Sequence, residues 1–326
     1  MFSLNTRKAK SHEKIGISLQ SDGVAMARID AVSQPPQLLG YAFEPTSDAS
    51  TVEQTLQAIL RQHRLTGTDT VLVLDKNDFI LQIMESPQVE SEEMLQAIRW
   101  KLKEVINFDP GEAIVDIFDV PQPSGSSRQA MVYVVAAHQA RLQEKASPLL
   151  ENAIQLEAID IPELTQRNIA ELLPENEMGV ALLALGPDSG LLTLTHQSSL
   201  YLSRQLDFGY RELERPQAAD DSDMSMVGLS PDLQRAMDQI VLEVQRSLDY
   251  YEGNFGLAPI NSLVIAPLAV EVPGLINYMA SQLGVQVRML DISAVLDTRE
   301  PIERSQQAAC WEAIGGALRH DDVGQA

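Results

Sequence analysis

The side chains that most often carry catalysis or hold a metal ion are scattered along this sequence. Its five histidines stand at positions 12, 63, 138, 196 and 320, and no two have the spacing of metal ligands. The single cysteine, Cys310, excludes an internal disulfide and a cysteine-rich metal site. The sequence contains no Gly-x-Ser-x-Gly elbow, no Gly-x-x-x-x-Gly-Lys-Ser/Thr loop and no Gly-x-Gly-x-x-Gly motif after a strand. Because it has 46 carboxylates, chance explains any close pair, and no motif demands catalysis.

The composition indicates a folded and strongly acidic protein. The 326 residues suffice for about two domains of roughly 150 residues. A net charge of −22 repels nucleic-acid phosphates and anionic lipid headgroups, which argues against non-specific nucleic-acid binding. No apolar run reaches the ~18 to 20 residues that span a bilayer, and the polar start Met1–Lys8 lacks a secretion segment. We therefore expect a soluble cytoplasmic protein.

Two similar strand patterns must position any site. An Asp-Gly turn at 21–23 predicts a hairpin, and the order β-β-β-α-β follows, with strands at 15–19, 24–29, 37–43 and 70–75 and a helix at 51–62. A second buried strand at 180–186, a glycine-containing turn and strands at 189–196 and 198–208 repeat this opening.

A small β-α-β-β-α module is expected between these halves. Ser91 is a candidate N-cap, and apolar residues on one helical face continue to Ile106, ahead of Pro110; they are Leu95, Ile98, Leu102, Val105 and Ile106. Strands are expected at 79–84, 114–120 and 130–137, and a second helix at 139–153.

The last third of the chain predicts a long helix and a closing unit. Ser230-Pro231 opens a helix with an apolar stripe that we expect to end at Gly253. Further elements are expected as strands at 262–266 and 285–290 and helices at 273–283 and 306–318. The acidic stretch 214–228 is expected to be a solvated loop.

The repeated halves with an insertion resemble the actin-like ATPase superfamily, an α/β fold of the ribonuclease H-like type. Over roughly residues 14 to 318 the sequence is similar to the PilM family of type IV pilus assembly proteins. The segment 242–251, Leu-Glu-Val-Gln-Arg-Ser-Leu-Asp-Tyr-Tyr, resembles the family's Glu-Ile-x-Arg-Ser-Leu-x-Tyr-Tyr helix, and 15–19 with Arg28 resembles its first phosphate hairpin. The resemblance implies a first half at 1–76, an inserted module at 77–160 and a second half at 161–326.

The same resemblance implies a nucleotide site between the hairpins, from which this sequence departs. The family has an Asp and glycines in each hairpin, which hold Mg²⁺ through water and bring backbone N–H groups to phosphates. Here Ser18 and Ala184 stand in the two Asp positions, and Ala266-Pro267 replaces glycines expected against adenine. The expected vestigial nucleotide contacts are Ser18, Gln20, Ser21, Gly186, Asp188, Ser189, Glu243, Ala266 and Pro267. No catalytic or metal-binding residue is expected.

These losses lead us to expect an adaptor that is not an enzyme and needs no cofactor, with weak binding of ATP and Mg²⁺ left open. The resemblance implies a cytoplasmic scaffold in the inner-membrane assembly platform of a type IV pilus of the MSHA (mannose-sensitive haemagglutinin) type. It would bind the N-terminal cytoplasmic tail of a PilN-like bitopic protein in a cleft of the first subdomain. It would also contact the motor ATPase, and its membrane association would be indirect.

Two other functions stay open. A nucleotide-dependent switch, in pilus assembly or type II secretion, would need a shifted site, for which Asp22 and Asp188 lie within a few residues of the expected positions. A sugar- or acetate-kinase-like enzyme would need a catalytic carboxylate between intact phosphate hairpins, and the sequence offers none.

Overall fold

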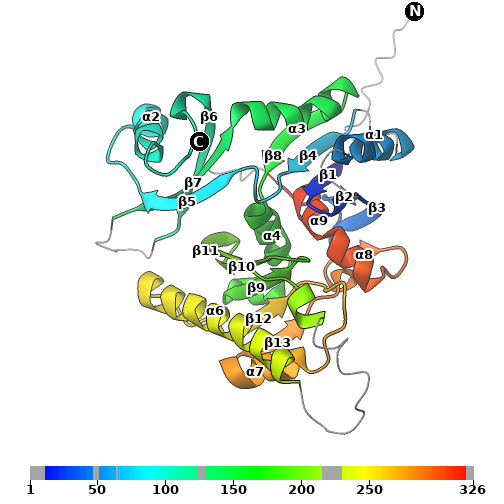
Figure 1. Cartoon of the computed structure of the whole chain (residues 1–326), viewed down its shortest axis with the longest axis vertical. Coiled ribbons are helices and arrows are strands. Elements are labelled where there is room, and N and C mark those ends of the chain that lie inside the picture. The colour runs from blue at the N-terminus through cyan, green and yellow to red at the C-terminus, as the bar shows by residue number, and fades with distance from the viewer. Residues whose placement is uncertain are drawn as a thin grey trace, which may run out of the picture.

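A computed structural model describes residues 12–46, 51–63, 65, 67–122, 129–214 and 230–320, and its strands form three sheets (Figure 1). The six-stranded sheet contains, in spatial order, β14 (Asp297–Thr298), β3 (Gln37–Pro45), β2 (Gly23–Asp30), β1 (Glu13–Gln20), β4 (Asp69–Val73) and β8 (Gln155–Asp160). The five-stranded sheet contains β11 (Ser199–Leu206), β10 (Gly190–His196), β9 (Val180–Leu185), β12 (Ser262–Ile265) and β13 (Gln286–Met289). The three-stranded sheet has the order β5 (Ile80–Glu85), β7 (Met131–His138), β6 (Ala113–Val120).

The two large sheets share one topology. In each, three antiparallel strands are followed by two parallel ones: β1, β2 and β3 precede β4 and β8, and β9, β10 and β11 precede β12 and β13. Both openings are hairpins whose side chains alternate between two buried faces, as the sequence predicted. The repeat is that of the actin-like ATPase fold, and the predicted fold class is confirmed.

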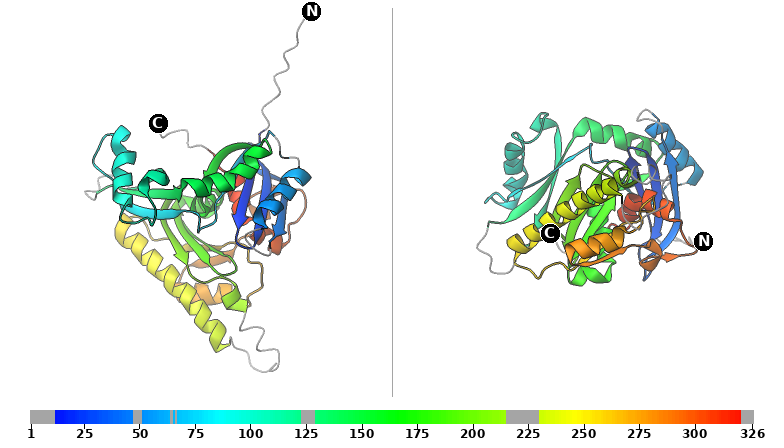
Figure 2. Two further views of the ribbon diagram at one scale, coloured as in Figure 1. Left: turned by 45° about the horizontal axis from the view of Figure 1, so that its top comes forward. Right: turned by 60° about the horizontal axis from the view of Figure 1, so that its bottom comes forward.

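Helices sandwich both sheets (Figures 1 and 2). On the outer side of the first sheet lie α1 (Val52–His63) and α3 (Gln139–Glu151), while α6 (Pro231–Phe255) and α7 (Leu275–Leu283) cover the outer side of the second. Between the sheets, α9 (Trp311–Ala317) packs on β1, β2 and β4, and α4 (Pro162–Glu171) packs on β9, β10 and β11. Because α4 and α9 also pack on each other, the two halves share one apolar cluster at the centre of the molecule.

Two glycines let α9 lie close to its neighbours. A Cβ on Gly16 of β1 would stand 1.9 Å from the carbonyl oxygen of Ala313, and one on Gly315 would stand 2.3 Å from that of Thr165 in α4. Both contacts are with backbone, which a side-chain rotation cannot relieve. The C-terminal helix is therefore wedged between the first strand of the chain and the first helix of the second half.

The inserted module connects the halves through one face of its sheet. Its helix α2 (Ser91–Leu102) covers one side of β5, β6 and β7. On the other side, Val120 and Tyr133 belong to the core of the second half. The Tyr133 hydroxyl accepts a hydrogen bond from the Ser203 amide at 3.1 Å and donates one to the Tyr201 carbonyl at 3.4 Å.

The domain ranges 1–76, 77–160 and 161–326 stay a prediction, because the sheet to which a strand belongs does not by itself define a domain. The sheets place β8, at 155–160, with the first half, and α9 packs on that half from the far end of the chain. The expected small module is present as a separate sheet with its own apolar cluster around Ile98 and Leu102.

Several element boundaries differ from the prediction. The first module helix ends at Leu102, and Leu95 and Val105 are each 42% exposed, because Ile98 and Leu102 provide the buried face. Gly253 lies inside α6, which ends where Gly256 adopts a left-handed φ of 63°.

Other elements were missed or lie beyond the described residues. The C-terminal helix is divided at Cys310 into α8 (Arg304–Ala309) and α9, and the sequence did not predict β8 or α4. Short 3₁₀ turns are η1 (Pro110–Glu112), η2 (Pro174–Glu177) and η3 (Ile292–Ala294). The acidic loop, apart from Glu214, lies outside the described residues.

Candidate functional site

The polar side chains of the first hairpin face the C-terminal helices. Ser18 is fully buried, and its hydroxyl donates to Glu312 Oε2 of α9 at 2.6 Å. Two residues on, and therefore on the same face of β1, the Gln20 side-chain amide donates to the Ala309 carbonyl at 2.9 Å. Ser21 is exposed in the turn. Two of the three predicted residues of this hairpin are therefore hydrogen-bonded within the protein.

Glu312 is a carboxyl in an unusual environment. Burial raises its pKa to about 7, and the nearby carboxylates Asp75, Glu163 and Asp22 act in the same direction, while the hydrogen bond from Ser18 opposes them. Near neutral pH a large fraction of this carboxyl is therefore protonated, whereas an ordinary glutamate is ionised. Sequence reasoning missed Glu312, since it lies 294 residues from Ser18 and no motif surrounds it.

The second hairpin forms a closed turn from Gly186 to Ser189. The Gly186 amide donates to the Ser189 carbonyl at 2.8 Å, and the Gly186 carbonyl accepts from the Tyr210 amide at 2.9 Å. Gly209 makes this packing possible, because a Cβ there would lie 2.3 Å from the Gly186 carbonyl oxygen. Asp188 is exposed and forms an ion pair with Arg211.

The structure brings the two turns within electrostatic reach of each other. Burial raises the pKa of Asp22. The nearby carboxylates Asp188 and Asp75 raise it further, whereas the Arg211 guanidinium lowers it. Asp22 and Asp188, the two residues suggested for a shifted site, thus lie close enough to each other and to Arg211 for their charges to interact. Asp75 and Arg211 were not predicted, and their positions just beyond a strand or turn carry no specific signal.

The remaining predicted contacts have other partners. Glu243 on α6 accepts from Arg204 at 3.2 Å and from Arg246 at 3.0 Å. Ala266 is buried and its amide donates to the Leu183 carbonyl at 2.8 Å, and Pro267 is also buried. Ala266 and Pro267 therefore pack into the second half, beside β9.

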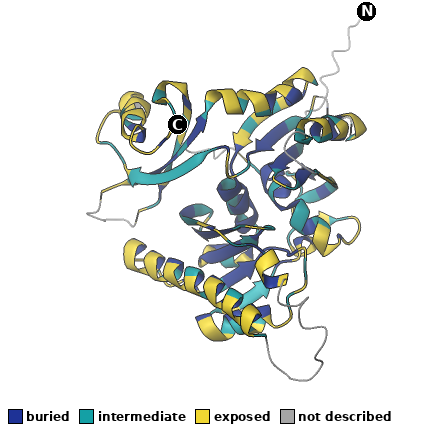
Figure 3. Ribbon diagram, in the orientation of Figure 1, coloured by how far each residue is buried: buried dark blue, intermediate teal, exposed yellow. Residues whose placement is uncertain are grey.

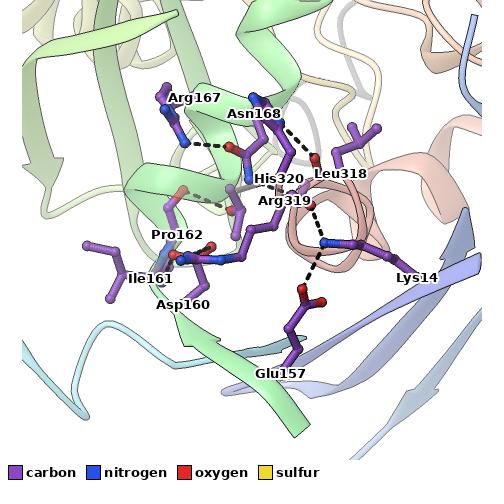
Figure 4. Close-up of polar contacts among 12 residues, drawn as sticks. Lys14, Glu157, Asp160, Ile161, Pro162, Arg167, Asn168, Leu318, Arg319 and His320 are labelled. Carbon is purple, nitrogen blue, oxygen red and sulfur yellow. Dashed lines mark hydrogen bonds and ion pairs between the residues drawn. The ribbon is translucent and has the colours of Figure 1, made fainter. Parts of the chain in front are cut away.

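Two further buried carboxylates lie where the first half leads into the second. Glu163 is 1% exposed; its Oε1 accepts from Gln205 at 2.9 Å, and burial raises its pKa. Asp160, 2% exposed, pairs with Arg319 at 3.1 Å and accepts from the Ile161 amide at 2.9 Å (Figure 4). Burial raises the pKa of Asp160 although Arg319 opposes that shift.

The same close-up shows polar contacts that join β1 to β8 and to the end of α9 (Figure 4). Lys14 of β1 donates to the Arg319 carbonyl at 2.9 Å and pairs with Glu157 of β8 at 3.1 Å. The Asn168 side chain of α4 donates to the Gly315 carbonyl at 2.9 Å. This cluster holds α9, β1, β8 and α4 at one crossing and has the character of a structural joint.

A groove of about 390 Å³ opens at one end of the module. The loop before β5, the turn after α2, the end of β7 and the start of α3 line it, with side chains that include Asn77, Asp78, Asn107, Phe108 and Arg141. The Asp78 side chain is 6% exposed and stands 3.6 Å from Lys145. Beside the groove, β5 forms an edge of its sheet, and an extended segment can pair with such an edge.

Within the described ranges, no three or more histidine, cysteine, aspartate or glutamate side chains are arranged to hold a metal ion. Among the helices in those ranges, none is both long and apolar enough to cross a membrane.

Comparisons with known proteins place the fold. No protein-family model matches the sequence, and no curated protein matches it. A chain of the PilM-PilN type IV pilus biogenesis complex is 20% identical, with a TM-score of 0.70 over 94% of this chain and 97% of that one. The cytoplasmic domain of EpsL, an inner-membrane component of the type II secretion system of Vibrio cholerae, is 11% identical, with a TM-score of 0.47 over 93% and 94%. A Bacteroides thetaiotaomicron protein with an actin-like ATPase fold and unknown function is 11% identical, with a TM-score of 0.48 over 95% and 99%. The first likeness establishes that this chain has the fold of a pilus biogenesis protein over nearly its whole length.

Proposed function

We propose that this chain is a PilM-like adaptor of the inner-membrane assembly platform of a type IV pilus. The observation that carries this proposal is the TM-score of 0.70 to a chain of the PilM-PilN complex, with almost complete coverage of both chains. The sequence resemblance of 242–251 to the PilM family helix adds support and favours a protein like MshI of the MSHA pilus. In this role the chain works in the cytoplasm, is held at the inner membrane by its partners, and contacts the motor ATPase.

The partner we assign is the N-terminal cytoplasmic tail of a PilN-like bitopic protein, bound in the groove of about 390 Å³ beside β5. An extended tail pairs its backbone with the edge of β5 while its side chains enter the groove. The buried Asp78 carboxylate offers the tail an acceptor at the wall of the groove. A net charge of −22 accelerates the encounter with a basic tail.

We further propose that this chain does not hydrolyse ATP. The residues expected at its nucleotide site fit a magnesium–nucleotide poorly: Ser18 and Gln20 are bonded to α9 and α8 residues, and Pro267 is buried where an adenine would need open space. Loss of a metal-positioning carboxylate costs several kcal/mol of transition-state stabilisation. The expected role is therefore binding, with the fold acting as a scaffold.

Titration of the purified protein with a synthetic tail peptide tests the adaptor role. We expect binding at micromolar peptide, at least tenfold weaker binding for Asn107→Trp, which fills the groove, and unchanged binding for Asn261→Trp, an exposed position before β12 in the second half. Failure of the wild-type protein to bind would refute the adaptor role. Equal binding by both variants would refute the groove but not the role.

Calorimetric titration with Mg-ATP, followed by a phosphate-release assay, tests the second proposal. We expect no heat up to millimolar nucleotide and no phosphate release. Turnover would overturn the proposal in favour of the nucleotide-dependent switch, and Asp22 and Asp188 would then be the first residues to substitute.

A further inference from the structure

The module carries an exposed aromatic and basic surface at the C-terminal end of α2. We name it the Trp100 patch and define it by its residues, Arg99, Trp100, Lys101, Lys103 and Val105. Trp100 is 78% exposed, more than any other large apolar side chain in the part of the chain that the structure describes, and Val105 is 42% exposed. The Lys103 ammonium lies 5.8 Å from the centre of the Trp100 ring.

The patch is not part of the module's core. Ile98 and Leu102, which flank Trp100 in the helix, are fully buried against the three-stranded sheet. Residues two positions away on a helix point to the opposite side, so Trp100 faces away from the sheet, on the exposed side of α2 (Figure 3). A tryptophan with 78% of its surface exposed contributes little to folding, and an apolar surface rimmed by charges marks a contact site.

The charge around Trp100 is opposite to that of the whole molecule. Three basic side chains fall within residues 99–103, in a chain with 24 basic and 46 acidic residues. The acidic residues of α2, Glu92 and Glu93, lie in its first turn, at the other end of the helix, and Glu104 is the one carboxylate within 99–105. A molecule of charge −22 is repelled by an anionic surface, so it approaches one most readily with a locally basic face.

We propose that the Trp100 patch seats directly on anionic lipid headgroups. The Trp100 indole has the amphipathic character of a side chain at a membrane–water interface, and the Arg99 and Lys103 side chains carry long apolar stems below charges that pair with lipid phosphates. The Lys101 ammonium, which donates to the Glu85 carbonyl at 3.0 Å, adds its charge to the same surface. An acidic protein surface is the other class of partner that fits this charge, and the vesicle experiments below distinguish the two.

This contact orients the molecule and does not anchor it alone. Each basic side chain near an anionic surface increases binding about fivefold, so three give on the order of a hundredfold. Asn107 and Phe108, which line the proposed tail groove, follow the patch within a few residues. The groove and the patch thus belong to the same end of the module, although the lipid contact does not depend on tail binding.

Flotation with vesicles, without any peptide, tests the proposal. The probes are vesicles of phosphatidylglycerol and phosphatidylcholine in equal parts, compared with vesicles of phosphatidylcholine alone. We expect the protein to bind the anionic vesicles, Lys101→Gln/Lys103→Gln to bind about thirtyfold more weakly, and Arg235→Gln/Arg304→Gln, an equal loss of exposed charge on α6 and α8, to bind as the wild type does.

The two tryptophans provide a second readout. Trp100 is 78% exposed and Trp311 is 5% exposed, so brominated lipids in the anionic vesicles should quench part of the emission in the wild type and none in Trp100→Phe. Absence of binding to anionic vesicles, or equal weakening by both charge variants, would overturn the proposal. Binding of an acidic protein that requires Lys101 and Lys103, without quenching by lipid, would assign the patch to a protein partner instead.

Discussion

Substitution of Arg319 by methionine tests whether the joint between the halves carries stability. Asp160 is 2% exposed and Arg319, 30% exposed, is its ion-pair partner at 3.1 Å. Without the guanidinium the buried carboxylate must stay charged or take up a proton. Protonating a carboxyl of ordinary pKa 3.8 at pH 7 costs about 4 kcal/mol, which sets an upper limit. Because removing one partner of a buried pair typically costs ~3–5 kcal/mol, we expect Arg319→Met to lose about 3 kcal/mol.

The companion substitutions separate the pair from its surroundings. Asp160→Asn keeps an oxygen to accept from the Ile161 amide and leaves Arg319 to be hydrated, so we expect a loss of about 1–2 kcal/mol. The double variant should lose less than the sum of the two single ones by at least about 1 kcal/mol. Arg304→Met removes a partner from the exposed pair with Glu271 and should cost under about 1 kcal/mol.

Urea unfolding followed by the fluorescence of the buried Trp311 measures all four variants. The loss in Arg319→Met should also shrink as pH falls from 7 toward 5, because the unpaired Asp160 takes up its proton more readily there. Equal stability of Arg319→Met and Arg304→Met, or strictly additive single losses, would show that the joint is held by packing and not by this pair.

Three more predictions concern other buried contacts. Gly16→Ala should lower the free energy of unfolding in urea by about 3 kcal/mol or more, because its Cβ meets the Ala313 carbonyl. Gly40→Ala, with no atom within 4 Å of the new Cβ, should change that free energy by under about 1 kcal/mol. An unchanged stability of Gly16→Ala would contradict the wedged position of α9. Tyr133→Phe should cost about 1–3 kcal/mol, since it leaves the Ser203 amide without its acceptor, and an unchanged urea midpoint would refute the bridging role of that hydroxyl. The pKa of Glu312 in the folded protein is raised to about 7 from 4.5, so the stability that its protonated carboxyl contributes is complete below pH 4.5 and is lost as pH rises to 7. The free energy of unfolding of the wild type relative to Glu312→Gln should therefore fall across that range. Parallel pH profiles of the two proteins would disprove the shift.

Features with a local signal were predictable from the sequence. The hairpins needed only alternating apolar residues and a turn, and the start of α6 needed only Ser230, whose side chain accepts from the Leu233 amide at 3.2 Å, and Pro231. The order of the strands, together with the family resemblance, then led to the correct fold class. Apolar spacing was misleading at Leu95, which is exposed on α2, and at Val105, which lies beyond the end of that helix.

The buried polar contacts could not be predicted in the same way. Ser18 was expected to face a nucleotide, but its partner is Glu312, and that pairing depends on where α9 lies after the whole chain has folded. The strand β8 has no clear turn signal beside it, and Pro162, at the start of α4, was not used as a helix-start signal, so the crossing that contains Asp160 and Glu163 was also missed. The sequence showed that Ser18 and Ala184 depart from the family pattern at the hairpins. The hydrogen-bond partner of Ser18, however, is set by tertiary packing.

The position of α9 has a consequence for how the protein is made. The strands β1 and β2 emerge early from the ribosome, yet their inner face is covered by a helix at residues 311–317, which is translated almost last. Translation at ~5–20 residues per second leaves that apolar face open for many seconds while the second half is synthesised. Nascent chains of this protein should therefore require chaperones until α9 arrives, and termination before residue 311 should yield an aggregation-prone product even though every strand is complete.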